Sequence, residues 1–215
     1  MTETPRSYSS LESDTKYSGE LKDGKKHGHG TLIFSDGTKY VGNFKDDLIH
    51  GHGTLFYEDG DVYVGGFVND TEHGHATYTW VNGDEYIGEH KDGSRSGLGI
   101  FRYADGTVYE GEFKDGNFDG KGEYITPNGS KYIGEYKDGD RCGNGISTWV
   151  SGHKYEGEYK DNEFCGQGTF TFTDGSKVMG EWRNNEVNGY AVRYDPAGNI
   201  TQKGIYKDNK WLHDN

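Results

Sequence analysis

Apolar and polar positions alternate in short runs along the chain, and each run predicts a β-strand. Residues 40–45 read Tyr-Val-Gly-Asn-Phe-Lys, so two aromatic residues and a glycine share one side of the run. Residues 53–57 read Gly-Thr-Leu-Phe-Tyr and alternate in the same way. Side chains two positions apart point to the same face of a strand. The pattern therefore predicts strands over 40–45 and 53–57.

This two-strand unit recurs every 23 residues. Glycine stands two, eleven and twenty residues after the first aromatic position of every copy, as at Gly42, Gly51 and Gly60. A fixed short period predicts a repeat array in place of an ordinary globular core. The first positions are Tyr17, Tyr40, Tyr63, Tyr86, Tyr109, Tyr132 and Tyr155, with Val178 as the eighth.

Asx-Gly pairs predict the turns between the strands. A type I′ hairpin turn needs positive φ at both central residues, which Asn, Asp and Gly adopt most readily. We expect two-residue turns at Asp36-Gly37, Asp59-Gly60, Asn82-Gly83, Asp105-Gly106, Asn128-Gly129 and Asp174-Gly175. A second set predicts longer connections, at Asp23-Gly24, Asp92-Gly93, Asp115-Gly116 and Asp138-Gly139. Together the two sets predict a continuous antiparallel meander.

The two faces of the predicted sheet differ in chemistry. Glycine inside a strand marks close approach by another group, and we expect an aromatic ring from a neighbouring repeat above Gly42 and its equivalents. One face would then carry stacked aromatic columns. The other face carries alternating carboxylates and basic side chains, such as Glu112 beside Lys114, and should be solvated.

Composition limits what the chain can build and bind. Hydrophobic residues make up only 30%, and most of the apolar material is aromatic, with 17 Tyr, 10 Phe and 4 Trp. A thick aliphatic core is excluded by this composition. The net charge of −13 disfavours nucleic acid and anionic membranes, because both attract basic surfaces.

Several features favour a cytoplasmic location. No apolar run approaches the roughly 20 residues that a membrane helix needs. Residues 1–16 are polar and predict a flexible tail without an apolar signal segment. Cys142 and Cys165 occupy the same position of successive repeats, about 9–10 Å apart in a two-strand repeat, which predicts two free thiols.

The signature resembles the MORN repeat. Residues 109–116 read Tyr-Glu-Gly-Glu-Phe-Lys-Asp-Gly and residues 50–54 read His-Gly-His-Gly-Thr. The resemblance covers about residues 17–212 and implies an elongated, single-layer antiparallel β-meander of about eight 23-residue hairpin repeats, curved around an aromatic-lined groove. It also implies a non-enzymatic role in binding or scaffolding. Residues 17–215 would form the array, with an atypical capping repeat from about Val178, where Ala191 also replaces a glycine.

Candidate chemical motifs give no catalytic or cofactor site. The His-x-His pairs 27–29, 50–52 and 73–75 could grip a transition metal on one strand face, but no third ligand accompanies a pair. We interpret them as structural, with a metal site or a pH-responsive patch as the alternatives. The Gly-x-Gly pairs lack the context of a phosphate loop. We expect no enzyme activity, no cofactor and no bound metal.

The aromatic face is the candidate binding site. A one-layer sheet leaves one face of its rings uncovered, and exposed apolar patches mark interaction sites. We expect second-strand tryptophans to flank the groove. The predicted partner-binding residues are Tyr40, Phe44, Tyr63, Phe67, Trp80, Tyr109, Phe113, Tyr132, Tyr136, Trp149, Tyr155 and Tyr159.

These features predict a scaffold for protein–protein interaction. The chain is similar in size, acidity and repeat content to the MORN-type radial spoke head proteins, which implies an axonemal component of cilia or flagella. Another cytoskeletal scaffold, for example at a basal body, is an alternative. A phospholipid-membrane tether and an in-trans regulatory subunit of a kinase or methyltransferase are two others. The groove could hold a different chain, a second copy or a related MORN protein.

Overall fold

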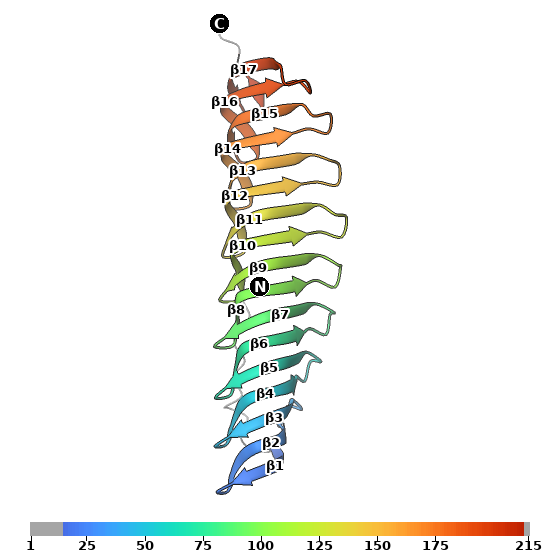
Figure 1. Ribbon diagram of the computed structural model, residues 1–215, viewed down its shortest axis with the longest axis vertical. Coiled ribbons are helices and arrows are strands. Elements are labelled where there is room, and N and C mark those ends of the chain that lie inside the picture. The colour runs from blue at the N-terminus through green and yellow to red at the C-terminus, as the bar shows by residue number, and fades with distance from the viewer. Residues whose placement is uncertain (1–14, 213–215) are drawn as a thin grey trace. The chain divides into compact units, whose positions relative to one another are not determined.

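The structure is a computed structural model that describes residues 15–212. Every regular element in this range is a β-strand, which confirms the predicted all-β class (Figure 1). The chain divides into two compact units, Met1–Asn117 and Phe118–Asn215, and each is described by itself. The predicted N-terminal tail, residues 1–16, lies almost wholly outside the described residues.

The strands of the first unit follow one another as a meander. Each pairs antiparallel with the next, from β1–β2 through β8–β9. First strands of a repeat have seven residues and second strands have nine. The strands are β1 (Lys16–Lys22), β2 (Lys25–Ile33), β3 (Lys39–Lys45), β4 (Leu48–Phe56), β5 (Val62–Val68), β6 (Thr71–Thr79), β7 (Glu85–Lys91), β8 (Ser94–Arg102) and β9 (Val108–Lys114).

The second unit repeats this arrangement. Its strands also pair consecutively and antiparallel, from β10–β11 through β17–β18. The single-layer meander predicted from the alternating pattern is thus present in both units. The strands are β10 (Asn117–Ile125), β11 (Lys131–Lys137), β12 (Asp140–Thr148), β13 (Lys154–Lys160), β14 (Glu163–Thr171), β15 (Lys177–Arg183), β16 (Glu186–Tyr194), β17 (Ile200–Lys207) and β18 (Lys210–Trp211).

Tight two-residue turns join the first strand of a repeat to the second. Asp23 and Gly24, between β1 and β2, have φ values of 52° and 80°. Positive φ at both central residues is the mark of a type I′ turn. The equivalent Asp46 and Asp47 adopt φ values of 52° and 75° without any glycine. These are the positions where the sequence analysis expected longer connections, so that expectation was wrong.

The Asx-Gly pairs expected to form two-residue turns lie instead in longer loops. The loop after β2 spans residues 34–38, and the Gly37 N–H donates a hydrogen bond to the Phe34 oxygen at 3.1 Å. Only the glycine has positive φ, at 97°, and Asp36 does not. A four-residue turn followed by a left-handed glycine also closes hairpins. The dipeptide alone could not separate the two turn types.

A β-bulge interrupts the pairing between the two strands of a repeat, and it lies next to the first paired glycine. In the second repeat Gly42 pairs with Gly53, but Phe44 pairs with Ile49, so one residue of β3 faces three of β4. Gly51 in the middle of the bulge has a φ of 92°, which side-chain-bearing residues rarely adopt. A bulge bends and twists its strand. The glycine eleven residues after the first position of each repeat is therefore a bend in the sheet.

A tyrosine ring lies across the paired glycines at each bend. A side chain at Gly42 would meet the Tyr40 hydroxyl and the Gly53 backbone, and one at Gly53 would overlap the Tyr40 ring. The occupant above Gly42 therefore belongs to the same repeat, not to a neighbouring repeat as expected. The reason is the bend in the second strand of the repeat, which brings Gly53 beneath the Tyr40 ring of the first strand.

The hydroxyl of each ring closes the bend by a hydrogen bond. It donates to the backbone oxygen three residues further along the chain, at the point where the bulge begins. The bonds run from Tyr17 to Glu20 (2.7 Å), Tyr40 to Asn43 (3.1 Å), Tyr63 to Gly66 (2.8 Å), Tyr86 to Glu89 (2.9 Å), Tyr109 to Glu112 (2.9 Å), Tyr132 to Glu135 (3.0 Å) and Tyr155 to Glu158 (3.1 Å).

The eighth repeat departs from this arrangement at two positions. Val178 stands in place of the tyrosine and is 2% exposed, and Ala191 stands in place of the second glycine and is 0% exposed. Ala191 pairs directly with Gly180. An alanine is also present at this position in the third repeat, where Ala76 pairs with Gly65 and Tyr63 is retained. In an ordinary repeat the second glycine and the tyrosine ring are a closely packed pair, as Gly53 and Tyr40 are.

This pairing predicts coupling between the two positions in an ordinary repeat. Gly53→Ala should lower the free energy of unfolding by about 1–3 kcal/mol, because the methyl group overlaps the Tyr40 ring. Tyr40→Val should also destabilise, by about 2–4 kcal/mol, through the lost ring. The double variant should lose less than the sum, with a coupling of at least about 1 kcal/mol. Urea unfolding of the four proteins measures this.

Gly60→Ala is the control for the glycine change. Gly60 lies in a loop at a φ of 96°, away from any tyrosine ring. Its replacement should destabilise the protein to the same extent with or without Tyr40→Val. Additive effects for Gly53→Ala and Tyr40→Val would show that the ring does not exclude a side chain at Gly53.

Candidate partner-binding rim

The strand aromatics predicted as the binding face are buried. Ten of the twelve predicted residues are at most 6% exposed. The expectation of partly exposed rings was therefore wrong, although partner binding by these residues stays a prediction. The ten are Tyr40, Phe44, Tyr63, Phe67, Tyr109, Phe113, Tyr132, Tyr136, Tyr155 and Tyr159.

The cause is the sharp bend within each second strand. Arg95 and Phe101 both belong to β8, and their guanidinium carbon and ring centre are 5.0 Å apart. Phe164 and Phe170 of β14 have ring centres 6.5 Å apart. Six residues of straight strand would separate them by about 20 Å. The strand folds back on itself, and the rings fill the inside of the bend.

The two predicted tryptophans have a different environment. Trp80 and Trp149 each follow the last residue of a second strand and are half-buried. The Trp80 ring centre lies 4.3 Å from that of Tyr78 and 5.1 Å from that of Phe101. Binding of a partner by these two residues stays a prediction. They leave part of the ring surface open to solvent, where a partner could reach it.

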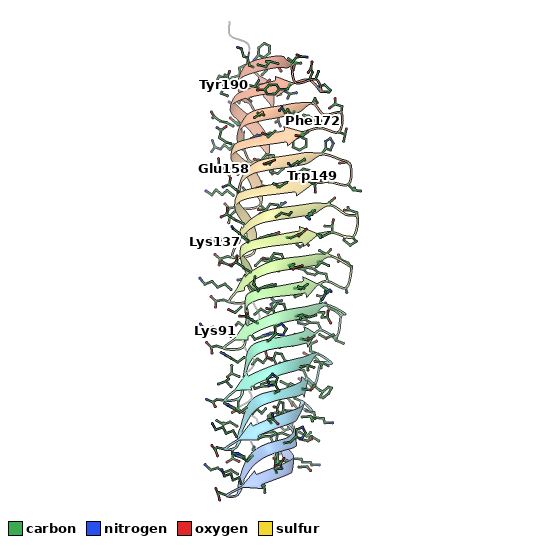
Figure 2. All side chains as sticks on the ribbon, viewed as in Figure 1. Lys91, Lys137, Trp149, Glu158, Phe172 and Tyr190 are labelled. Atoms are coloured by element: carbon green, nitrogen blue, oxygen red, sulfur yellow. The ribbon has the colours of Figure 1, made fainter. Side chains whose placement is uncertain are left out.

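Other half-buried rings were missed, and three of them are considered with the tryptophans. Tyr103 and Phe172 take the same loop position as the tryptophans, and Phe164 lies at the start of β14. Figure 2 shows Trp149 and Phe172 at the loop ends of the second unit, on the opposite side from Lys137 and Glu158. The signal was present in the sequence: an aromatic residue two positions before most Asx-Gly pairs. We call Trp80, Tyr103, Trp149, Phe164 and Phe172 the rim.

Rings in the second unit form a connected cluster beneath the rim. The centre of the Trp149 ring lies 6.2 Å from that of Phe164 and 5.8 Å from that of Phe170. Phe164 stacks on Tyr155 at 3.7 Å with an interplanar angle of 5°. The Phe172 ring lies 5.0 Å from that of Phe170. Such packing holds the exposed ring edges rigidly, as an interface anchor requires.

One buried arginine adds positive charge beside a rim ring. Arg95 is 7% exposed, and its Nη2 donates to the Gly116 oxygen at 2.7 Å. Its guanidinium carbon lies 5.6 Å from the Trp80 ring centre, which is a cation–π contact. Arg141 is half-buried and lies against the inner ring of Tyr132, at 5.4 Å.

Burial keeps the inner tyrosines neutral. Desolvation raises the pKa of Tyr40 to about 12, and the hydrogen bond to Asn43 opposes the shift. Burial also raises the pKa values of Tyr86 and Tyr132 well above the ordinary value of 10. These hydroxyl groups therefore serve as hydrogen-bond donors and not as acids.

His90 is the one buried histidine of the aromatic columns in the described part of the chain. It takes the place that Phe67 and Phe113 hold in neighbouring repeats, and it is 4% exposed. Its ring centre lies 5.2 Å from those of Tyr63 and Tyr86. The pKa of His90 is lowered to about 4, mainly by burial and in addition by the charges of Arg95 and His75.

The glutamates of the opposite face are exposed to solvent, and they also accept hydrogen bonds from the backbone. Glu20, Glu135 and Glu158 are exposed, as the sequence predicted. Each accepts a hydrogen bond from the backbone N–H that follows the bulge glycine, at 3.0, 3.1 and 2.7 Å. The glutamate of the signature thus satisfies a donor that the bulge leaves without a strand partner.

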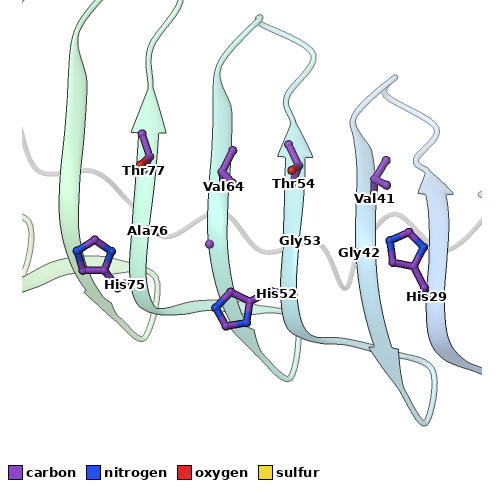
Figure 3. Close-up of a pocket in the computed structure, with 11 residues that line it drawn as sticks. His29, Val41, Gly42, His52, Gly53, Thr54, Val64, His75, Ala76 and Thr77 are labelled. Atoms are coloured by element: carbon purple, nitrogen blue, oxygen red, sulfur yellow. The ribbon is translucent and has the colours of Figure 1, made fainter.

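The histidine pairs separate into two environments. The first member contacts a turn residue of the next repeat, as in His27 with Asp46 at 3.7 Å and His73 with Asp92 at 3.9 Å. The second member lines a shallow groove on the outer face of the first unit (Figure 3). Val41, Thr54, Val64 and Thr77 lie beside His29, His52 and His75 in this groove.

Residues 15–212 hold no group of three or more His, Cys, Asp or Glu side chains placed to bind a metal ion. Cys142 and Cys165 are free thiols, and burial raises the pKa of each above its ordinary value. Within the described residues there is no helix that is long and apolar enough to cross a membrane.

The repeat signature matches a known family model along nearly the whole array. The model for the MORN repeat matches residues 17–39, 40–62, 63–85, 86–108, 109–131, 132–154, 155–177 and 179–200. This chain therefore belongs to the MORN repeat family. The first seven matched segments each begin at an inner tyrosine, the residue that closes the bend, and the eighth begins at Met179.

Solved structures give only distant similarity. One is the SAS-4 TCP domain of Drosophila melanogaster in complex with a proline-rich motif of Ana2, at 18% identity, covering 73% of this chain and 84% of that one with a TM-score of 0.43. Another is the CPAP G-box domain, at 14% identity, 80% and 90% coverage and a TM-score of 0.48. A third is the Danio rerio CPAP TCP10 domain, at 14% identity, 83% and 89% coverage and a TM-score of 0.41.

Similarity at this level carries no argument about function. The comparison with curated proteins found no match.

His90 predicts a pH-dependent stability. Its folded pKa of about 4 lies below the unfolded value of about 6.5. Between these values the unfolded chain binds a proton that the folded chain does not. Its contribution is therefore present above pH 6.5 and is lost as the pH falls towards 4, by on the order of 3 kcal/mol.

His90→Phe should remove this contribution while keeping the ring column filled, as Phe67 and Phe113 do. The difference in unfolding free energy between the two proteins should grow between pH 7.5 and pH 4 in favour of the variant. Urea unfolding at several pH values measures it. A difference independent of pH would show that folding does not lower the pKa of His90.

Proposed function

We propose that this chain is a non-catalytic scaffold that binds a protein partner at the rim. Within the cell, it would serve as a structural component of a ciliary or flagellar axoneme, of the radial spoke head kind. The observation that carries the proposal is the row of half-buried aromatic rings at the loop ends, held on rigidly packed strands.

The chemistry of the rim suits a protein segment. Aromatic residues anchored in a packed layer are the commonest hot spots of protein interfaces. Trp149 and Phe172 each present part of a ring to solvent above a buried aromatic cluster. The repeat places equivalent positions at regular intervals along each unit. An extended or helical segment with spaced apolar side chains could therefore contact several repeats.

The prediction that the inner tyrosines bind a partner is modified in this proposal. Tyr155 and Tyr159 are 0% and 3% exposed, so they support the rim from below and would not contact a partner directly. Of the predicted residues, Trp80 and Trp149 remain direct contacts. The buried rings fix the height and orientation of the exposed ones.

The axonemal assignment rests on the resemblance to radial spoke head proteins in size, acidity and repeat content. A net charge of −13 favours assembly with a basic partner surface over binding to an anionic membrane. A location in the cytoplasm, on the cytoskeleton of a cilium or flagellum, follows from this assignment. A membrane tether or an in-trans enzyme regulator would have different partners.

The rim predicts a specific loss of partner capture. The tagged double variant Trp149→Ser with Phe172→Ser should capture at least tenfold less partner than the unmodified chain from ciliated cells, because two anchors are removed. Cross-linking and mass spectrometry identify the partners. The unmodified chain should cross-link to axonemal proteins.

Val150→Ser is the matched control, since Val150 lies in the same loop beside Trp149 and is 71% exposed without ring contacts. It should capture as much partner as the unmodified chain. Equal capture by the double variant, with an unchanged circular dichroism spectrum, would move the site away from the rim. Recovery of a kinase or of membrane proteins without axonemal components would refute the axonemal role.

A further inference from the structure

The aromatic column of the first unit shows what covers each core residue. Phe44, Phe67 and Phe113 are 2–3% exposed. Each contacts the tyrosine of its own repeat and that of the preceding repeat. The preceding tyrosine lies 5.2 Å from Phe44, 5.2 Å from Phe67 and 4.9 Å from Phe113, between ring centres. A repeat therefore completes its core with a ring from the repeat before it.

Leu21 takes the first position of this column and lacks such a cover among the described residues. It is 62% exposed, whereas the residues at the equivalent positions are buried. Tyr17 is half-buried, although Tyr40 and Tyr63 are 0% exposed. Among the described residues, the core of the first repeat is therefore only partly covered at the open edge of β1.

The strand β1 has the features of an internal strand. In the described part of the chain it pairs only with β2, so one edge of its backbone is open. Edge strands usually carry protection, such as lysines or prolines that block further pairing. Lys16 and Lys22 are no such device here, because Lys39 and Lys45 take the same places in β3, which pairs on both edges.

The opposite end of the array carries a modification that β1 lacks. In β17 the tyrosine position is Gln202, which accepts a hydrogen bond from Tyr206 at 2.8 Å. The short strand β18 then covers part of the edge, with Tyr206 facing Trp211. Tyr206 is 1% exposed. A polar residue at the tyrosine position and a short strand complete that end, and within residues 15–212 neither is found at β1.

The sequence of β1 matches the strand that would have to cover it. At each junction between repeats glycine pairs with glycine, as Gly30 with Gly42, and two residues away Leu32 faces Tyr40. The next junction repeats this with Leu55 facing Tyr63. The residues Gly19-Glu20-Leu21 copy the Gly-x-Leu of these covering strands. A leucine stands in β1 where other repeats have an aromatic residue or histidine.

We propose that β1 pairs antiparallel with β1 of a second copy, around a two-fold axis at Gly19. Gly19 then faces its own equivalent, as Gly30 faces Gly42. Each Leu21 lies across from Tyr17 of the second copy, as Leu32 lies across from Tyr40. A symmetric contact of this kind is self-complementary and closes after two chains. The site is separate from the rim, so either proposal can fail without the other.

The contact is small, so the dimer should be concentration-dependent. A single seven-residue strand pair buries less than the roughly 1,200 Å² of a stable interface. Sedimentation velocity of the full chain over a hundredfold concentration range should show a monomer–dimer equilibrium. Leu21→Lys should weaken association at least tenfold, because a charge would replace the apolar contact with Tyr17. A chain that stays monomeric throughout, or a dimer that Leu21→Lys leaves unchanged, would overturn the proposal.

Leu98→Lys is the matched control, since Leu98 is 68% exposed on the internal strand β8. It should leave the dimer unchanged. The register has its own test, because Lys16 would face Lys22 of the second copy. In a background with both native cysteines replaced by serine, mixed Lys16→Cys and Lys22→Cys chains should form a disulfide between them.

Either cysteine variant alone should stay reduced, since like positions would lie about 20 Å apart across the two-fold axis. A disulfide formed equally well by one variant alone, or none in the mixture, would overturn the Gly19 register. Coverage of β1 by the chain's own N-terminal residues would appear as a monomer with no disulfide in the mixture.

Discussion

The structure depends on one repeated contact, a tyrosine ring lying across two paired glycines. The ring excludes any side chain at Gly42 and Gly53, and its hydroxyl donates to the backbone oxygen at the start of the bulge. The bulge glycine supplies the positive φ that turns the strand back under the ring. Three glycines, one tyrosine and one bend thus form a single unit. The eighth repeat differs at two of these positions, Val178 and Ala191, and the third repeat differs at one, Ala76.

This bend determines where a partner can reach the protein. It folds the two halves of each second strand together, so the inner rings have little solvent exposure. The rim rings keep part of their surface open to solvent, and four of them, Trp80, Tyr103, Trp149 and Phe172, lie in the loops between repeats. In the proposed function, the buried rings support the rim residues that would contact a partner. The proposed contacts are the half-buried rings above them.

The sequence predicted the features that depend on period and alternation. The strands, their antiparallel order and their buried faces follow from side chains two apart and from the 23-residue repeat. The turn types were reversed, because Asp-Gly fits both a two-residue turn and a longer loop with one left-handed glycine. The pairing of β1 with β2 decides between the two turn types at Gly24, and the sequence pattern did not supply that strand register. Exposure of the rings failed for a related reason: the His-Gly positions were interpreted as straight strand, although Gly51 bends it.

The candidate site was therefore predicted in part. Trp80 and Trp149 were identified, but Tyr103, Phe164 and Phe172 were not, since depth within a bent sheet is not encoded in alternation. The half-exposed position of Phe164 follows from the fold-back of β14 upon Phe170. His90 was also missed, because its burial depends on two tyrosines from different repeats.

The most direct test of this account is a spectrophotometric titration of the tyrosines in the folded protein. The account predicts two phases. Tyrosine side chains that are open to solvent ionise near pH 10. The inner tyrosines should ionise only above about pH 12, as the chain unfolds, since burial raises the pKa of Tyr40 to about 12. A single phase near pH 10 in a protein that stays folded would show that the rings are open to solvent, and it would contradict the closed bend on which this account rests.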